Sequence, residues 1–133
     1  MDKSILIVDD NPLNIKLAMS VLEAEGFSVE SARSAEEALV TMENHVPQLV
    51  LMDIGLPGMD GLALTRHLRS NTRYTGLRIV ALTALAMKGD DIRALEAGCN
   101  GYISKPIDTR TFARQVAAYL PGQSVAPTRG GGT

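Results

Sequence analysis

Short apolar runs alternate with helix-forming segments along most of the chain, and this alternation limits its possible folds more than any other feature. Four runs have the length and continuity of buried parallel strands: 5–8, 49–52, 79–82 and, with a weaker pattern, 102–103. A fifth run, 27–32, alternates apolar and polar residues, which is typical of a strand at the edge of a sheet. The sequence therefore predicts five strands, one of them at an edge.

Helical periodicity and helix-capping residues fill the segments between these runs. Asn11 followed by Pro12 predicts a helix start, because the first residue caps and the second fits the first helical position. Ser34 with Glu37 three residues later has the capping-box spacing and predicts a second start. The apolar face of the first helix is predicted to comprise Leu17, Ala18, Val21 and Leu22. Three further helices are predicted at 61–68, 90–97 and 108–120.

Five successive strand–helix units predict an α/β fold, a flavodoxin-like (βα)5 doubly wound parallel sheet with strand order 2-1-3-4-5. The right-handed crossover of each unit places its helix on one face of the sheet or the other. We expect this domain to occupy residues 1–120. Residues 121–133, which contain three consecutive glycines, show no periodicity and are predicted to be a disordered tail or the remnant of a linker.

Composition argues for a single soluble domain. A chain of 133 residues with a formal charge of −2 can bury one core and has no basic surface for nucleic acid or membranes. The single cysteine, Cys99, rules out an internal disulfide framework, and the N-terminus lacks a signal-peptide pattern. No stretch approaches the roughly 20 apolar residues of a membrane span. We therefore expect a cytoplasmic protein.

Reactive side chains follow the buried strands. Asp9 and Asp10 follow the first run, Asp53 the second buried run, Thr83 the next, and Lys105 the last. Because the carboxyl ends of parallel strands meet at one edge of a doubly wound sheet, we expect these side chains to lie together. Each alone has a plain structural explanation, such as a helix cap, a turn residue or a solvated charge, but none of these explains their shared position.

Three clustered carboxylates would raise one another's pKa unless a cation lay among them. Oxygen ligands that leave room for water and phosphate suit Mg²⁺, whereas Zn²⁺ prefers histidine and cysteine. A carboxylate beside such a metal can attack phosphorus and form an acyl phosphate, and Asp53 is the candidate nucleophile. The ammonium of Lys105 and the hydroxyl of Thr83 would stabilise the oxygens of the transferring phosphoryl group.

These motifs resemble a CheY-type receiver domain of the two-component response regulators. The resemblance rests on Val8-Asp9-Asp10, on the stretch DIGLPGMDG at 53–61, on Thr83-Ala84 and on Lys105-Pro106, and it extends over residues 4–120. The stretches 84–90, 98–99 and 102–107 are most similar to stand-alone receivers of the DivK type and to receivers of hybrid kinases.

The resemblance implies a phospho-accepting receiver of a two-component system or phosphorelay. Asp53 would be the phosphoacceptor, and the chain would catalyse only the phosphorylation and dephosphorylation of that residue. Asp10, Asp53 and the Gly55 carbonyl would bind Mg²⁺, and Asp9 would act through a metal-bound water.

The same resemblance implies a switch and two kinds of partner. Thr83 and Tyr102 would form the switch pair, and the bond between Lys105 and Pro106 would be cis. The donor would be a histidine kinase or a histidine phosphotransfer protein. A downstream protein would bind the face made by the fourth helix, fifth strand and fifth helix. Donor contacts are expected on the first helix, at Leu13, Ile15 and Met19.

Three alternative functions remain to be distinguished. A flavodoxin-like FMN binder shares the sheet, but Asp9 and Asp10 would repel the FMN phosphate. A haloacid-dehalogenase-type phosphatase would need a second acid two residues after the nucleophile, where this chain has Gly55. A receiver-like module that binds partners without phosphorylation is the third alternative.

Overall fold

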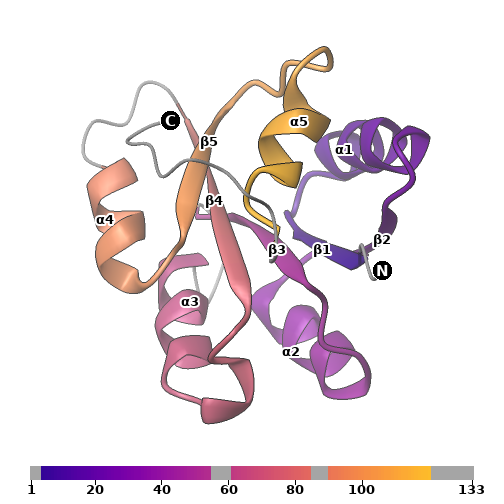
Figure 1. Ribbon diagram of the computed structural model, residues 1–133. Coiled ribbons are helices and arrows are strands. Elements are labelled where there is room, and N and C mark those ends of the chain that lie inside the picture. Colours follow the sequence, from indigo (N-terminus) through magenta and orange to yellow (C-terminus); the bar gives the residue numbers. More distant parts are fainter. Residues whose placement is uncertain (1–3, 55–60, 85–89, 121–133) are drawn as a thin grey trace.

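Five strands alternate with five α-helices in the computed structural model, which describes residues 4–54, 61–84 and 90–120 (Figure 1). The strands are β1 (Ser4–Val8), β2 (Ser28–Ala32), β3 (Leu49–Asp53), β4 (Arg78–Ala84) and β5 (Gly101–Lys105). The helices are α1 (Pro12–Ala24), α2 (Ala35–Asn44), α3 (Gly61–Arg69), α4 (Asp90–Ala97) and α5 (Phe112–Ala117), with a short 3-10 helix, η1 (Thr72–Tyr74).

The strands form one parallel sheet in the order β2-β1-β3-β4-β5, which confirms the predicted fold class and strand order. The edge position predicted for the alternating run is also confirmed. Strand β2 begins one residue later than expected, because the Phe27 N–H donates to the Leu22 carbonyl at the end of α1 (3.1 Å). Strand β2 lies on one side of β1, whereas β3, β4 and β5 lie on the other, so the order of the strands reverses between β1 and β3. The carboxyl ends of β1 and β3 therefore border the crevice in which such sheets bind ligands.

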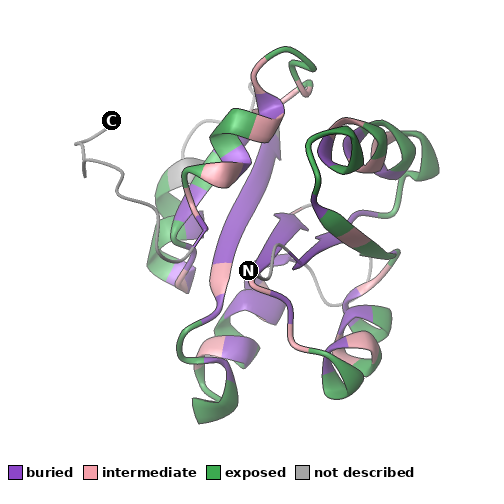
Figure 2. Ribbon diagram, turned by 45° about the vertical axis from the view of Figure 1, so that its right-hand side comes forward, coloured by how far each residue is buried: buried purple, intermediate pink, exposed green. Residues whose placement is uncertain are grey.

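Helices cover both faces of the sheet, which explains the continuous apolar runs of β1 and β3. Ile5 and Ile7 of β1 pack with α1 and α5, whereas Leu6 and Val8 point to the opposite face, which α2, α3 and α4 cover (Figures 1 and 2). No helix within the described residues has the length and apolar character needed to cross a membrane.

Helix α1 begins as predicted but presents a different face to the core. The Asn11 side chain accepts hydrogen bonds from the backbone N–H groups of Leu13 (2.9 Å) and Asn14 (3.4 Å). Its buried residues are Ile15, Ala18 and Leu22. The prediction of Leu17 as a core residue is wrong, because Leu17 is 41% exposed. The prediction of an exposed Ile15 is also wrong, since Ile15 lies one helical turn before Ala18 and faces the sheet with it.

The predicted boundaries hold for α4 and, within one residue, for α3, but not for α5. Helix α5 was predicted over 108–120 and spans Phe112–Ala117. Asp108 forms a turn before it, because its carboxylate accepts from the Arg110 backbone N–H (3.0 Å) and its carbonyl accepts from the Phe112 N–H (2.9 Å). The apolar stripe Phe112, Val116 and Leu120 is nevertheless buried as expected.

Arg69, at the end of α3, contacts the two turns that precede β4 and β5 at the amino-terminal edge of the sheet. Its Nε donates to the Gly98 carbonyl (2.8 Å), and Nη2 donates to Asn100 Oδ1 (2.7 Å). Its Nη1 donates to the carbonyls of Leu77 (2.7 Å) and Tyr74 (3.3 Å). Gly98 has a φ of +118°, and a Cβ there would lie 2.6 Å from the Arg69 Cγ, so the arginine stem needs glycine beneath it.

Candidate functional site

The carboxyl-terminal ends of the central strands place the predicted site residues at one edge of the sheet. Asp9 directly follows β1, and Asp53 is the last residue of the adjacent strand β3. Asp53 pairs in register with Leu82 of β4, one residue before Thr83. Lys105 ends β5.

Three carboxylates converge at this edge. One oxygen from each of Asp9, Asp10 and Asp53 lies within 4.8 Å of the others, in a grouping that could hold a metal ion. Asp9 and Asp53 are buried, whereas Asp10 is exposed and leaves the cluster open to solvent. The convergence expected from the sequence is therefore observed.

Lys105 completes the cluster with a positive charge. Its Nζ lies 3.5 Å from Asp9 Oδ2 and 3.3 Å from Asp53 Oδ2, so one ammonium bridges two of the three carboxylates. The lysine side chain is 24% exposed, and the partly solvated position allows it to meet a ligand that enters from solvent. The peptide bond that follows it, to Pro106, is cis as expected.

The negative charge of the Asp9 carboxylate is only partly offset by the groups around it. Its Oδ1 accepts a hydrogen bond from the Asn11 backbone N–H (2.9 Å). Among the described residues, its buried Oδ2 accepts no hydrogen bond and forms an ion pair with Lys105 alone. Burial raises the pKa of Asp9 and the charge of Asp53 adds to the effect, while the Asn11 N–H and Lys105 oppose it. A buried oxygen without a donor, among hard oxygen ligands, fits a divalent cation such as Mg²⁺.

Thr83 lies on β4 and Tyr102 on the adjacent strand β5, and both belong to the same face of the sheet. Thr83 is buried near the end of β4 and is in register with Ser104. Tyr102 lies two residues earlier on β5 and is 40% exposed. Gly55, predicted as a carbonyl ligand of the metal, lies outside the described residues.

Two residues shape the site in ways that sequence reasoning missed. Asn11 was predicted only as a helix cap, yet its backbone N–H also holds Asp9. Gly61, the first residue of α3, lies directly on the backbone of the phosphoacceptor candidate, since a Cβ there would be 2.4 Å from the Asp53 carbonyl oxygen. A glycine at the first position of a predicted helix, where proline or a polar residue is commoner, is the signal of this close approach.

Comparison with known proteins places this geometry in a family. Residues 5–117 match the family model of the response regulator receiver domain. The polar-differentiation response regulator DivK of Brucella ovis is 43% identical over 120 residues, which cover 90% of this chain and 98% of that protein.

Two solved structures share the fold. A CheY-like response regulator receiver domain protein from Methanospirillum hungatei JF-1 is 33% identical with a TM-score of 0.79, covering 88% of this chain and 92% of that one. The signal receiver domain of a histidine kinase from Syntrophus aciditrophicus is 31% identical with a TM-score of 0.82, covering 96% of both chains. The chain therefore belongs to the response regulator receiver domain family, with similarity both to DivK and to a kinase-borne receiver.

Proposed function

We propose that this receiver accepts a phosphoryl group on Asp53 and that phosphorylation changes its binding to a downstream protein. The donor is a histidine kinase or a histidine phosphotransfer protein of a two-component system or phosphorelay. The observation that carries the proposal is the Lys105 ammonium, which lies within 3.5 Å of both Asp9 and Asp53 beside an open cluster of three carboxylates.

Asp9, Asp10 and Asp53 are the residues that would hold Mg²⁺. Asp9 Oδ2, which accepts no hydrogen bond from the described residues, supports this assignment, and so does the all-oxygen donor set. When bound, the ion supplies charge neutralisation to phosphoryl oxygens. The Gly55 carbonyl stays a proposed ligand.

The chain's own residues would carry the transfer. A carboxylate oxygen of Asp53 forms a bond to phosphorus as the bond from phosphorus to the donor nitrogen breaks, and that nitrogen keeps the electron pair. Lys105 and the Thr83 hydroxyl stabilise the negative oxygens of the phosphoryl group. The protein then acts on its own carboxylate and not on a separate substrate.

The test is incubation with a small phosphodonor such as acetyl phosphate, with Mg²⁺ or with EDTA. We expect one added phosphoryl group per chain in the intact mass with Mg²⁺ and none with EDTA. If no phosphoryl group is added under either condition, the proposal is wrong. The remaining alternative would then be a receiver-like module that binds partners without phosphorylation. Steady hydrolysis of a generic phosphate ester would favour the phosphatase alternative. A yellow colour of the purified protein would favour the FMN binder.

Mg²⁺ should stabilise the fold, more at neutral than at acidic pH. Because burial raises the pKa of Asp9 above its ordinary value of 3.8, the folded chain holds this proton more tightly than the unfolded chain. The stability that Asp9 contributes is present below pH 3.8 and is lost as pH rises through the higher folded-state value. As pH rises the buried carboxylate loses this proton, and a cation relieves the cost of the buried negative charge.

Thermal denaturation across a pH series, with and without Mg²⁺, measures this effect. At 100 times its dissociation constant a ligand adds about 2.7 kcal/mol to the unfolding free energy. We expect a gain of this order near pH 7 and a much smaller gain near pH 4. Asp9→Asn should lose most of the gain at pH 7, because it removes one of the carboxylates that would hold the ion. An equal gain at both pH values would contradict the proposed site.

Thr83 and Tyr102 form the proposed switch, in which Thr83 moves toward the phosphoryl group and Tyr102 fills the vacated space. Thr83→Ala should keep phosphorylation but uncouple it from Tyr102. The chain has no tryptophan. Of its three tyrosines, Tyr74 is buried, Tyr119 is half-buried and Tyr102 is exposed, so Tyr102 should contribute most to acrylamide quenching of tyrosine fluorescence. We expect phosphorylation to reduce quenching in the wild type and not in Thr83→Ala. The same reduction in Tyr102→Phe would contradict the assignment.

The downstream protein would bind the face of α4, β5 and α5. Ile92 and Leu95 of α4 are exposed apolar residues, as is Tyr102 of β5. A cytoplasmic location and the absence of nucleic-acid or membrane binding accompany this proposal. Residues 1–120 are proposed as the receiver domain, and 121–133, which lie outside the described residues, as the tail or linker remnant.

A further inference from the structure

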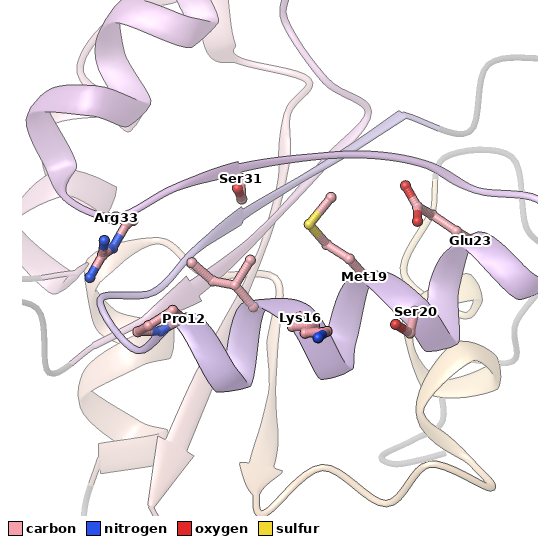
Figure 3. Close-up of a pocket in the computed structure, with 8 residues that line it drawn as sticks. Pro12, Lys16, Met19, Ser20, Glu23, Ser31 and Arg33 are labelled. Carbon is pink, nitrogen blue, oxygen red and sulfur yellow. The ribbon is translucent and has the colours of Figure 1, made fainter.

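A groove of about 430 Å³ runs between α1 and the edge strand β2 (Figure 3). Lys16, Met19, Ser20 and Glu23 of α1 line one side, and Ser31 and Arg33 lie across from them. Ser31 shares a face of β2 with Val29, which packs against the core beneath α1. Ser31 is exposed, and its small side chain leaves the groove open at this position.

The α1 residues that line the groove are arranged so that they complement the same residues of a second, antiparallel α1. Lys16 and Glu23 are seven residues apart, so they lie on nearly the same side of the helix, about two turns from each other. Met19 and Ser20 lie midway between them. If a second α1 lies antiparallel, with a two-fold axis between Met19 and Ser20, each Lys16 meets a Glu23. Each Met19 then meets the small side chain of Ser20.

The groove also carries opposite charges at its two ends. Arg33 lies at the end near Pro12, and Glu23 lies at the other end (Figure 3). Within the described part of the chain, Lys16 and Glu23 are exposed and form no ion pair. A surface with a cation at one end and an anion at the other is complementary to a copy of itself turned by half a revolution.

We propose that the groove between α1 and β2 is a self-association surface, which binds a second copy of this chain with the two α1 helices antiparallel. A second copy fits better than an unrelated partner, because it supplies the opposite charges and the knob-and-hole pair at the required spacing. This surface is separate from the face of α4, β5 and α5 but includes Met19, where donor contacts are expected. The proposal does not depend on phosphorylation of Asp53.

Sedimentation velocity of the full chain over a wide concentration range tests the proposal at low salt. Wild type should show a monomer–dimer equilibrium that weakens as salt is added. Lys16→Glu or Glu23→Lys alone turns both pairs of the dimer into like-charge contacts. We expect each change to raise the dissociation constant about ten-fold or more.

Mixing the two variants gives the decisive result. Lys16→Glu and Glu23→Lys should each stay monomeric where the wild type dimerises, yet their mixture should form a heterodimer, since every contact between them again joins opposite charges. Glu43→Lys on α2 and Arg66→Glu on α3 are matched controls, because they make the same charge changes at exposed positions away from the groove. They should dimerise as the wild type does.

Three outcomes would overturn the proposal. One is a wild type that stays monomeric at every concentration. Another is a dimer that neither charge reversal weakens. The third is a mixture that associates no better than its separate components, which would exclude the antiparallel pairing of Lys16 with Glu23.

Discussion

Asp53→Asn should abolish phosphorylation of the chain. The amide lacks the anionic oxygen that attacks phosphorus, and its loss also removes one of the three carboxylates that would bind Mg²⁺. Because asparagine matches aspartate in size, the core around β3 should stay intact. With Mg²⁺ and acetyl phosphate we expect the added mass seen in the wild type to fall below detection. Intact-mass spectrometry measures the result, and a circular dichroism melt verifies the fold.

Glu30→Gln is the matched control for this change. It neutralises an exposed carboxylate on β2 in the same way, away from the cluster, and should be phosphorylated at the wild-type rate. Phosphorylation of Asp53→Asn at an undiminished rate would mean that another residue accepts the group, and the proposed role of Asp53 would then be wrong.

Lys105→Met should slow phosphorylation strongly without weakening Mg²⁺ binding. Methionine keeps much of the length and volume of lysine but removes the ammonium that lies 3.3 Å from Asp53 Oδ2. Loss of one group that stabilises developing charge typically costs about 10²–10³ in rate. The same ammonium neutralises Asp9 and Asp53 in the structure and so competes with any second cation. Its removal should leave Mg²⁺ affinity equal or higher.

Initial phosphorylation rates at saturating Mg²⁺, together with Mg²⁺ titrations followed by thermal denaturation, separate these two effects. Lys105→Arg tests the geometry, because its charge is kept but its planar fork replaces a compact ammonium, and we expect an intermediate rate. A wild-type rate in Lys105→Met would contradict the proposed role of the lysine. A parallel loss of Mg²⁺ affinity would instead indicate that the substitution damages the metal site.

The fold and the convergence of the site were predictable because both follow from pattern and topology. Continuous apolar runs such as 49–52 indicate strands covered on both faces, and the alternating run of β2 indicates an edge. Once the strand order is known, Asp9, Asp53 and Lys105 must lie at one edge, since Asp9 directly follows β1 and the other two end their strands at the carboxyl side. No side-chain packing had to be known.

The remaining features depend on three-dimensional contacts that periodicity does not encode. Leu17 and Ile15 are equally apolar, and only the direction in which α1 docks on the sheet decides which is buried. The close approach of Gly61 to Asp53 depends on how α3 begins. The second role of Asn11 depends on a backbone N–H, which sequence identity does not reveal.

The Arg69 contacts have a mechanical consequence for signalling. By tying α3 to Gly98 and Asn100, they fasten the junction between α4 and β5 at the end of the sheet remote from the carboxylates. A signal that begins beside Asp53 therefore meets a helix with one anchored end. We therefore expect any movement of α4 on phosphorylation to be larger at its beginning than at its end, which Arg69 holds.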